Sequence, residues 1–105
     1  PQDVALLDAR KALDAFATLK TPVLGLIENM AVFTCPHCGK DSHIFGHGGV
    51  ADEAQKLGIP LLAQLPIDLD TRLGGDSGVP IATSGSAMAQ SYATLADRLI
   101  QGGVV

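Results

Sequence analysis

Two short, nearly continuous apolar runs are the feature that most restricts how this chain can fold. Residues 23–27 are Val-Leu-Gly-Leu-Ile, and residues 61–65 are Leu-Leu-Ala-Gln-Leu. Apolar runs of this length, without alternation of polar residues, are typical of strands that are covered on both faces, as in parallel sheets. We therefore predict an α/β fold with a partial parallel sheet and flanking helices.

Helical patterns surround both runs. Residues 3–19 and 50–57 are each predicted to form a helix, the second ended by Gly58 and Pro60. A short helix is expected over 68–73 and a turn over 74–78. Thr83 or Ser84 is predicted to cap a last helix that Gly102 and Gly103 end. One apolar face of that helix carries Met88, Tyr92, Leu95 and Leu99.

Two strands are too few for an independent parallel sheet, which needs neighbouring strands and cover on both faces. Pro1 also suits the first turn of a helix, yet no Ser, Thr, Asp or Asn precedes it as a cap. We therefore expect the chain to be a fragment of a larger α/β protein.

The segment between residues 31 and 49 holds both cysteines and all three histidines but no periodic pattern, so we predict a functional loop. Cys35 and Cys38 are separated by two residues, a spacing that lets two thiolates reach one metal from a tight turn. Pro36 and Gly39 favour such a turn. Two ligands make only half of a tetrahedral zinc site or of a four-iron cluster.

Three interpretations of the cysteine pair remain open at this point. A local zinc site would add His43 and His47 to Cys35 and Cys38, and a shared site would take both cysteines from a second copy of the chain. The third is a thiol–disulfide oxidoreductase of the thioredoxin type, with Val79-Pro80 in the place of its cis-proline. It is disfavoured, because glycines follow Cys38 where that fold begins a long helix.

Charge and hydropathy exclude several classes of function. The formal net charge is −4 and no lysine or arginine cluster occurs, which argues against nucleic-acid binding. No apolar run has the length of a membrane span, and the first residues do not resemble a signal peptide. Paired cysteines without a secretion signal indicate a reducing compartment, so we expect a cytoplasmic protein.

Residues 22–30, Pro-Val-Leu-Gly-Leu-Ile-Glu-Asn-Met, resemble a strand motif of the Mrp/ApbC family of iron–sulfur carrier ATPases. The resemblance continues in order through residues 35–39, 44–46, 58–62, 65–68 and 75–80. It implies that residues 1–105 are the C-terminal portion of one MinD-like P-loop NTPase domain and that 31–49 is its CxxC metal-binding loop. It further implies a homodimer in which Cys35 and Cys38 of both subunits hold a bridging 4Fe-4S cluster for delivery to apo iron–sulfur proteins. Zinc is an expected substitute in aerobic preparations.

The resemblance also implies nucleotide-binding residues. Asn29 matches a position whose side-chain amide contacts adenine, and Pro66 to Asp68 match a segment whose backbone lines the adenine pocket. From the residues alone, Asn29 is a turn former at the end of a strand and Asp68 begins a helix. No Gly-x-x-x-x-Gly-Lys-Ser/Thr motif occurs in the chain. We therefore expect ATP and Mg²⁺ to act only in the complete protein, and this chain alone not to hydrolyse ATP.

Overall fold

A parallel pair of strands lies at the centre of the fold. The structure is a computed structural model that describes residues 1–102. Strands β1 (Leu26–Glu28) and β4 (Leu61–Gln64) pair in parallel, with Leu26 opposite Leu61 and Glu28 opposite Gln64. The predicted α/β class with a partial parallel sheet is therefore confirmed. Both strands are shorter than the apolar runs that predict them.

The hydrogen-bonded contact between the two segments extends beyond the strands. The Leu65 N–H donates to the Glu28 carbonyl at 2.8 Å, and the Ala31 N–H donates to the Leu65 carbonyl at 2.9 Å. One step further, the Ile67 N–H donates to the Val32 carbonyl at 2.8 Å. Residues 29–32 therefore run alongside residues 65–67 at the carboxyl ends of both strands.

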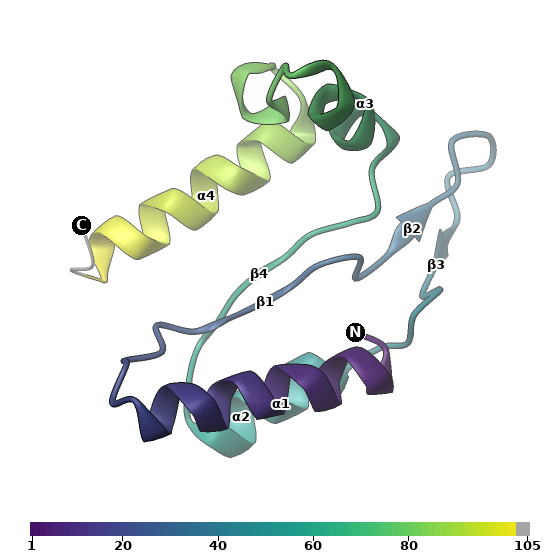
Figure 1. Ribbon diagram of the computed structural model, residues 1–105. Coiled ribbons are helices and arrows are strands. Elements are labelled where there is room, and N and C mark those ends of the chain that lie inside the picture. Colours follow the sequence, from purple (N-terminus) through teal and green to yellow (C-terminus); the bar gives the residue numbers. More distant parts are fainter. Residues whose placement is uncertain (103–105) are drawn as a thin grey trace.

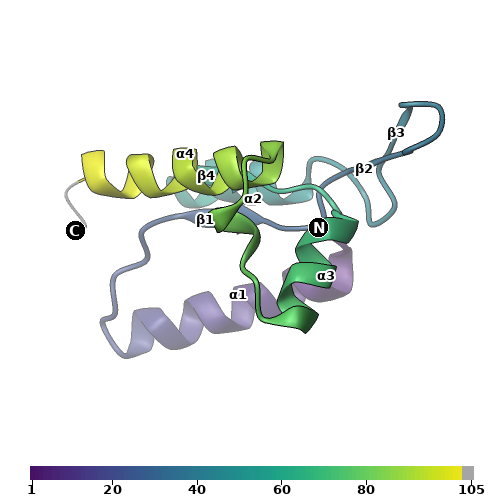
Figure 2. The same cartoon turned by 90° about the horizontal axis from the view of Figure 1, so that it is seen from above.

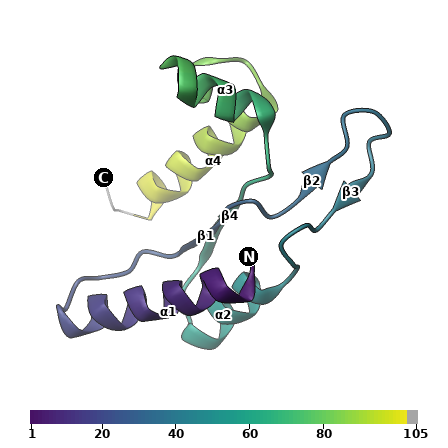
Figure 3. The same ribbon diagram turned by 45° about the vertical axis from the view of Figure 1, so that its right-hand side comes forward.

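Helices lie on opposite sides of the strand pair (Figures 1 and 3). Helices α1 (Asp3–Thr18) and α2 (Gly49–Leu57) lie on one side, and α4 (Ala87–Gln101) lies on the other. The Arg98 guanidinium of α4 donates to the Leu62 carbonyl of β4. Buried side chains come from both sides and from the end of β4, among them Val50, Ala54, Leu65, Met88 and Leu95.

One expectation for β1 is wrong, because Ile27 is 47% exposed and the strand is not covered on both faces. Ile27 lines a groove of about 340 Å³ between α1 and β1 that the described residues leave open. On the side of the strand pair that carries α1 and α2, Arg10 of α1 forms a salt bridge with Glu53 of α2. Its Nε and Nη2 atoms donate to the two carboxylate oxygens at 2.9 and 2.8 Å.

The C-terminal elements differ from the prediction in two places. Helix α3 (Leu69–Ser77) continues through the expected turn, because Gly74 lets its last turns pack against the backbone at Val79. The cap of α4 is Ser86, whose hydroxyl accepts the Ala89 N–H at 3.2 Å. The expected cap Thr83 instead ends a short 3₁₀ helix, η1 (Ile81–Thr83).

Ser84, the other expected cap, hydrogen-bonds the Ser86 hydroxyl at 2.8 Å and so supports the cap without being it. Helix α4 ends with Gly102 as its C-cap, and Gly103 lies outside the described residues. Within residues 1–102, no helix has both the length and the apolar character needed to cross a membrane.

Two adjacent glycines of α3 give opposite predictions. A Cβ on Gly74 would lie 2.5 Å from the Val79 carbonyl oxygen, so Gly74→Ala should lower the free energy of unfolding by about 1–3 kcal/mol. A Cβ on Gly75 meets nothing within 4 Å, so Gly75→Ala should raise it by about 0.5–1 kcal/mol. Urea denaturation of both variants checks this. Equal effects of the two changes would contradict the close packing at Gly74.

The Arg10–Glu53 pair predicts a pH-dependent stability. Its hydrogen bonds to Arg10 hold the pKa of Glu53 below the usual value, against the opposing effect of burial. The pair therefore stabilises the fold fully above the ordinary glutamate pKa of about 4.3, and this contribution is lost as the pH falls through the lowered pKa. Arg10→Gln removes this pair. The difference in the free energy of unfolding between the native sequence and Arg10→Gln should therefore decrease as the pH falls. A difference that stays constant with pH would contradict this assignment.

Candidate metal centre

Cys35 and Cys38 lie at the tip of a small β-hairpin. Strands β2 (Phe33–Thr34) and β3 (Asp41–Ser42) pair antiparallel, and the hairpin projects away from the helices (Figure 2). The Thr34 hydroxyl donates to the Asp41 carboxylate at 2.6 Å and joins the two arms. Residues 31–49 show no periodic pattern in the sequence, yet they contain this hairpin, because arms of two residues are too short to leave a strand pattern.

The turn between the arms sets the spacing of the thiols. The Cys35 N–H donates to the Lys40 carbonyl at 2.9 Å, and the Gly39 N–H donates back to the Cys35 carbonyl at 2.9 Å. Gly39 has a φ of 73°, a left-handed conformation that glycine adopts without steric cost. Gly39 thus closes the turn that presents both cysteines on one small loop.

The two cysteines have different surroundings. Cys35 is half-buried and Cys38 is exposed. The pKa of the Cys35 thiol is lowered chiefly because the backbone N–H of Cys38, and then that of His37, stabilise the thiolate. The Cys38 side chain adds to this effect and burial opposes it. Since thiolates are the metal-binding form of cysteine, the hairpin favours a metal ligand at Cys35.

The local zinc site is not assembled. Within residues 1–102, no group of three or more Cys, His, Asp or Glu side chains is placed to hold one metal ion. The rings of His43 and His47 instead contact each other in a tilted arrangement, with centroids 4.2 Å apart and ring planes at 43°. His43 Nδ1 lies 3.2 Å from the Ala31 carbonyl oxygen. The alternative ligand set of Cys35, Cys38, His43 and His47 is therefore not brought together among the described residues.

The thioredoxin-type alternative also fails. The residues after Cys35 form a turn and a short strand, and the next helix, α2, begins only at Gly49. The Val79–Pro80 peptide is trans. The helix that lowers the pKa of the reactive cysteine in that fold has no counterpart here.

The residues predicted to bind a nucleotide come close together through the parallel register. Asn29 follows β1 and the segment from Pro66 to Asp68 follows β4, and the two segments are joined where Ala31 and Val32 hydrogen-bond Leu65 and Ile67. The Asn29 side chain is exposed, and its Oδ1 accepts the Met30 N–H at 2.9 Å. Asp68 caps α3 by accepting the Thr71 N–H at 3.0 Å. The helix-start role of Asp68 is confirmed, whereas a nucleotide role for these residues stays a prediction.

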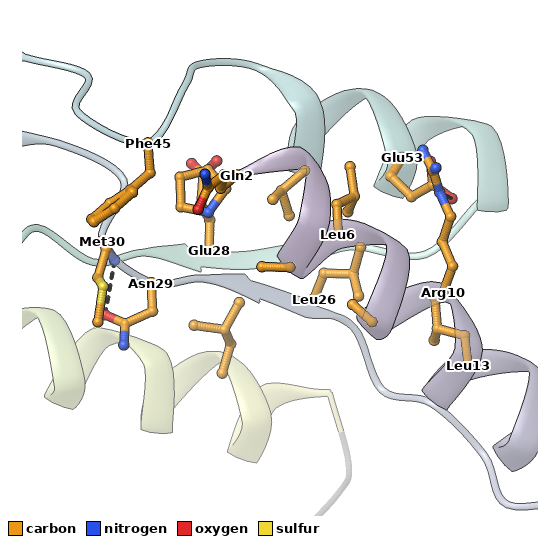
Figure 4. A pocket seen from close by; sticks show the side chains of 15 residues that line it. Gln2, Leu6, Arg10, Leu13, Leu26, Glu28, Asn29, Met30, Phe45 and Glu53 are labelled. Atoms are coloured by element: carbon orange, nitrogen blue, oxygen red, sulfur yellow. Dashed lines mark hydrogen bonds and ion pairs between the residues drawn. The ribbon is translucent and has the colours of Figure 1, made fainter.

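Two residues that the sequence does not single out stand at one end of the groove between α1 and β1. Met30 and Phe45 lie there, and the Arg10–Glu53 pair lies at the other end (Figure 4). Met30 has a φ of 57°, a left-handed conformation that costs a residue with a Cβ roughly 1–2 kcal/mol. The sequence does not reveal whether an apolar residue in a loop is buried or exposed. The exposure of Met30 and Phe45 could therefore not be predicted from the sequence.

Comparison with known proteins identifies the family. The ParA family described as the NUBPL iron-transfer P-loop NTPase matches residues 1–100. The chain belongs to this family. This finding confirms the resemblance to the Mrp/ApbC carriers.

Individual relatives of this family carry related names. An iron–sulfur protein required for NADH dehydrogenase, mitochondrial, from Arabidopsis thaliana is 42% identical over 97% of this chain and 33% of its own length. An iron–sulfur cluster carrier protein from Pseudomonas fragi is 46% identical over 91% of this chain and 34% of its own length. The chain thus spans about a third of the length of these relatives.

A solved structure supports the same family. A nucleotide-binding protein from Archaeoglobus fulgidus, in complex with ADP and with cobalt found in it, is 39% identical. It matches with a TM-score of 0.58 over 67% of this chain and 29% of its own. Over that part of the chain, the helices and strands follow the arrangement of this nucleotide-binding protein.

The surroundings of Cys35 predict its reactivity. In a Cys38→Ser variant, alkylation of Cys35 by iodoacetamide should rise with pH at a lower midpoint than in the same variant unfolded in urea. The reason is that the N–H groups at residues 37 and 38 survive the substitution and lower the Cys35 pKa only in the folded turn. Rates measured by mass spectrometry across the pH range check this. Equal midpoints in the folded and unfolded chain would contradict the thiolate-stabilising turn.

Proposed function

We propose that this chain carries an iron–sulfur cluster as cargo, held by Cys35 and Cys38, within a cluster-carrier protein. The observation that supports this most directly is the hairpin, which presents both cysteines on a projecting tip with a stabilised Cys35 thiolate. Thiolates are the usual ligands of iron–sulfur clusters. The names of the relatives, as cluster carrier and transfer proteins, point the same way.

The hairpin supplies two of the four thiolates that a 4Fe-4S cluster needs. Among the described residues no further ligating group stands beside the two cysteines. The simplest complete site therefore joins two copies of the chain about a two-fold axis, each contributing Cys35 and Cys38. The proposal is a homodimer that bridges one cluster and passes it to apo iron–sulfur proteins.

The position of the hairpin suits transfer. Cys38 is exposed and Cys35 is half-buried at a tip that projects from the helices, so an acceptor's thiolates can approach the cargo from outside. The Thr34–Asp41 hydrogen bond and the backbone bonds of the turn stabilise the loop that carries both cysteines. Thr34, Asp41 and the turn thus position the two cysteines at an exposed site that does not enclose the cluster.

In the complete protein we propose that ATP controls this transfer. Asn29 and the backbone from Pro66 to Asp68 lie at the carboxyl ends of two adjacent parallel strands, where α/β proteins bind nucleotides. Residues 1–105 would form the C-terminal portion of one P-loop NTPase domain. The exposed Asn29 amide would contact the base, while the residues that hold phosphate and Mg²⁺ would come from the rest of that protein.

Anaerobic reconstitution with ferrous iron and sulfide tests the cargo. The chain should bind four irons and four sulfides per two chains, and Cys35→Ser with Cys38→Ser should abolish binding. His43→Ala is the matched control and should load normally, since His43 contacts His47 and the Ala31 carbonyl rather than the cysteines. Metal analysis together with the size of the loaded species gives the result. One zinc per chain, lost in His43→Ala, would instead show the local zinc site and overturn the proposal.

A further inference from the structure

We propose that His43 and His47 together bind one divalent transition-metal ion through their ring nitrogens, without either cysteine. The two rings contact each other with their centroids 4.2 Å apart. Imidazole nitrogen is a favoured ligand of Cu²⁺, Ni²⁺ and Zn²⁺, and a given site holds Cu²⁺ most tightly among these ions. The site is independent of the proposed cluster cargo, because it uses neither Cys35 nor Cys38.

A short turn between β3 and α2 brings the two histidines together. The Gly46 N–H donates to the His43 carbonyl at 3.2 Å and closes the turn, and Gly46 has a φ of 102°. Glycine adopts that backbone conformation without steric cost. Phe45, within the turn, lines the groove between α1 and β1 and so anchors the turn to the rest of the fold (Figure 4). The spacing of the two histidines is therefore set by the backbone of this turn.

The ring of His43 is oriented in the way that metal ligands usually are. Its Nδ1 lies 3.2 Å from the Ala31 carbonyl oxygen. Because a carbonyl oxygen can only accept a hydrogen bond, this contact places a proton on Nδ1 and leaves the lone pair of Nε2 free for a metal. Metal-binding histidines characteristically donate their other ring N–H to a carbonyl or carboxylate, which fixes the ring and its tautomer.

The distance between the rings suits two neighbouring positions on one ion. With a metal–nitrogen bond of about 2.0 Å, two imidazoles bound at right angles have their ring centres about 4.5 Å apart. The 4.2 Å separation of His43 and His47 is close to that value. Right-angled positions are typical of the square-planar and tetragonal coordination that Cu²⁺ and Ni²⁺ adopt. Both residues are exposed, so an ion can reach the rings from solvent.

The bound ion keeps open positions and joins two elements of the fold. Within residues 1–102, no group of three or more Cys, His, Asp or Glu side chains gathers at one point, so water or a ligand from another molecule completes the coordination. His43 directly follows β3, and His47 stands two residues before α2. The ion therefore links the base of the hairpin to the start of α2. An ion that binds only this folded arrangement stabilises it.

Titration of the Cys35→Ser, Cys38→Ser variant with Ni²⁺ tests the site by isothermal titration calorimetry. One ion should bind per chain. In the same background, His43→Gln or His47→Gln should raise the dissociation constant at least tenfold, because one imidazole can no longer close the chelate. His37→Gln is the matched control and should change nothing, since His37 is also exposed but lies in the turn of the hairpin. Equal dissociation constants for the three histidine variants would overturn the proposal.

Two further measurements keep the test valid if a substitution disturbs the turn. In nuclear magnetic resonance spectra of the cysteine-free variant, paramagnetic Ni²⁺ should broaden the ring signals of His43 and His47 and leave those of His37 sharp. Saturating Ni²⁺ should also raise the urea denaturation midpoint of this variant, and raise it less in His43→Gln. Broadening centred on His37, or a midpoint that Ni²⁺ leaves unchanged, would contradict the site.

The outcomes separate this site from any site at the cysteines. A cysteine-free variant that binds no Ni²⁺ would assign the metal to a site that includes Cys35 and Cys38 and would overturn the proposal. Ni²⁺ that this variant binds, and that His43→Gln releases, belongs to the histidine pair. The cluster cargo is decided separately by the iron and sulfide content of the reconstituted chain, so either proposal can fail while the other stands.

Discussion

The parallel contact between β1 and β4 is the constraint on which the rest of the structure depends. It requires a glycine at position 25, where a Cβ would lie 2.6 Å from Leu62 Cγ and 2.7 Å from the Pro60 carbonyl oxygen. Because the strands are parallel, the chain must return to the start of the sheet between them, and α2 makes that crossover. The same register sets where the hairpin leaves β1 and where α3 begins after β4.

The position of the candidate metal centre depends on this contact between β1 and β4. The Ala31 and Val32 backbones bond to Leu65 and Ile67, so the chain is held up to the residue before the hairpin's first arm. From there the hairpin is stabilised by its own bonds, chiefly Thr34 to Asp41 and the turn closed by Gly39. A firmly held base with a small independent tip places the cysteines reproducibly and leaves them accessible.

Apolar side chains are buried on α2 and α4 but exposed in the groove between α1 and β1. Val50 and Ala54 of α2 and Met88 and Leu95 of α4 are buried, whereas Ile27 beside the groove is not. The Arg10–Glu53 ion pair joins α1 to α2 at one end of that groove. Exposed apolar side chains gathered in one groove are typical of surfaces that contact other protein.

The sequence by itself determined the α/β class, the approximate helices and the family, and its CxxC spacing predicts a metal half-site. These follow from local information: apolar period, turn residues and motif spacing depend on neighbours along the chain. Only the tertiary structure decided that residues 33–42 form a hairpin, that His43 and His47 contact each other, and that Met30 and Phe45 are exposed together. Those features depend on contacts between segments far apart in sequence, such as β1 with β4, and on arms too short to show a period.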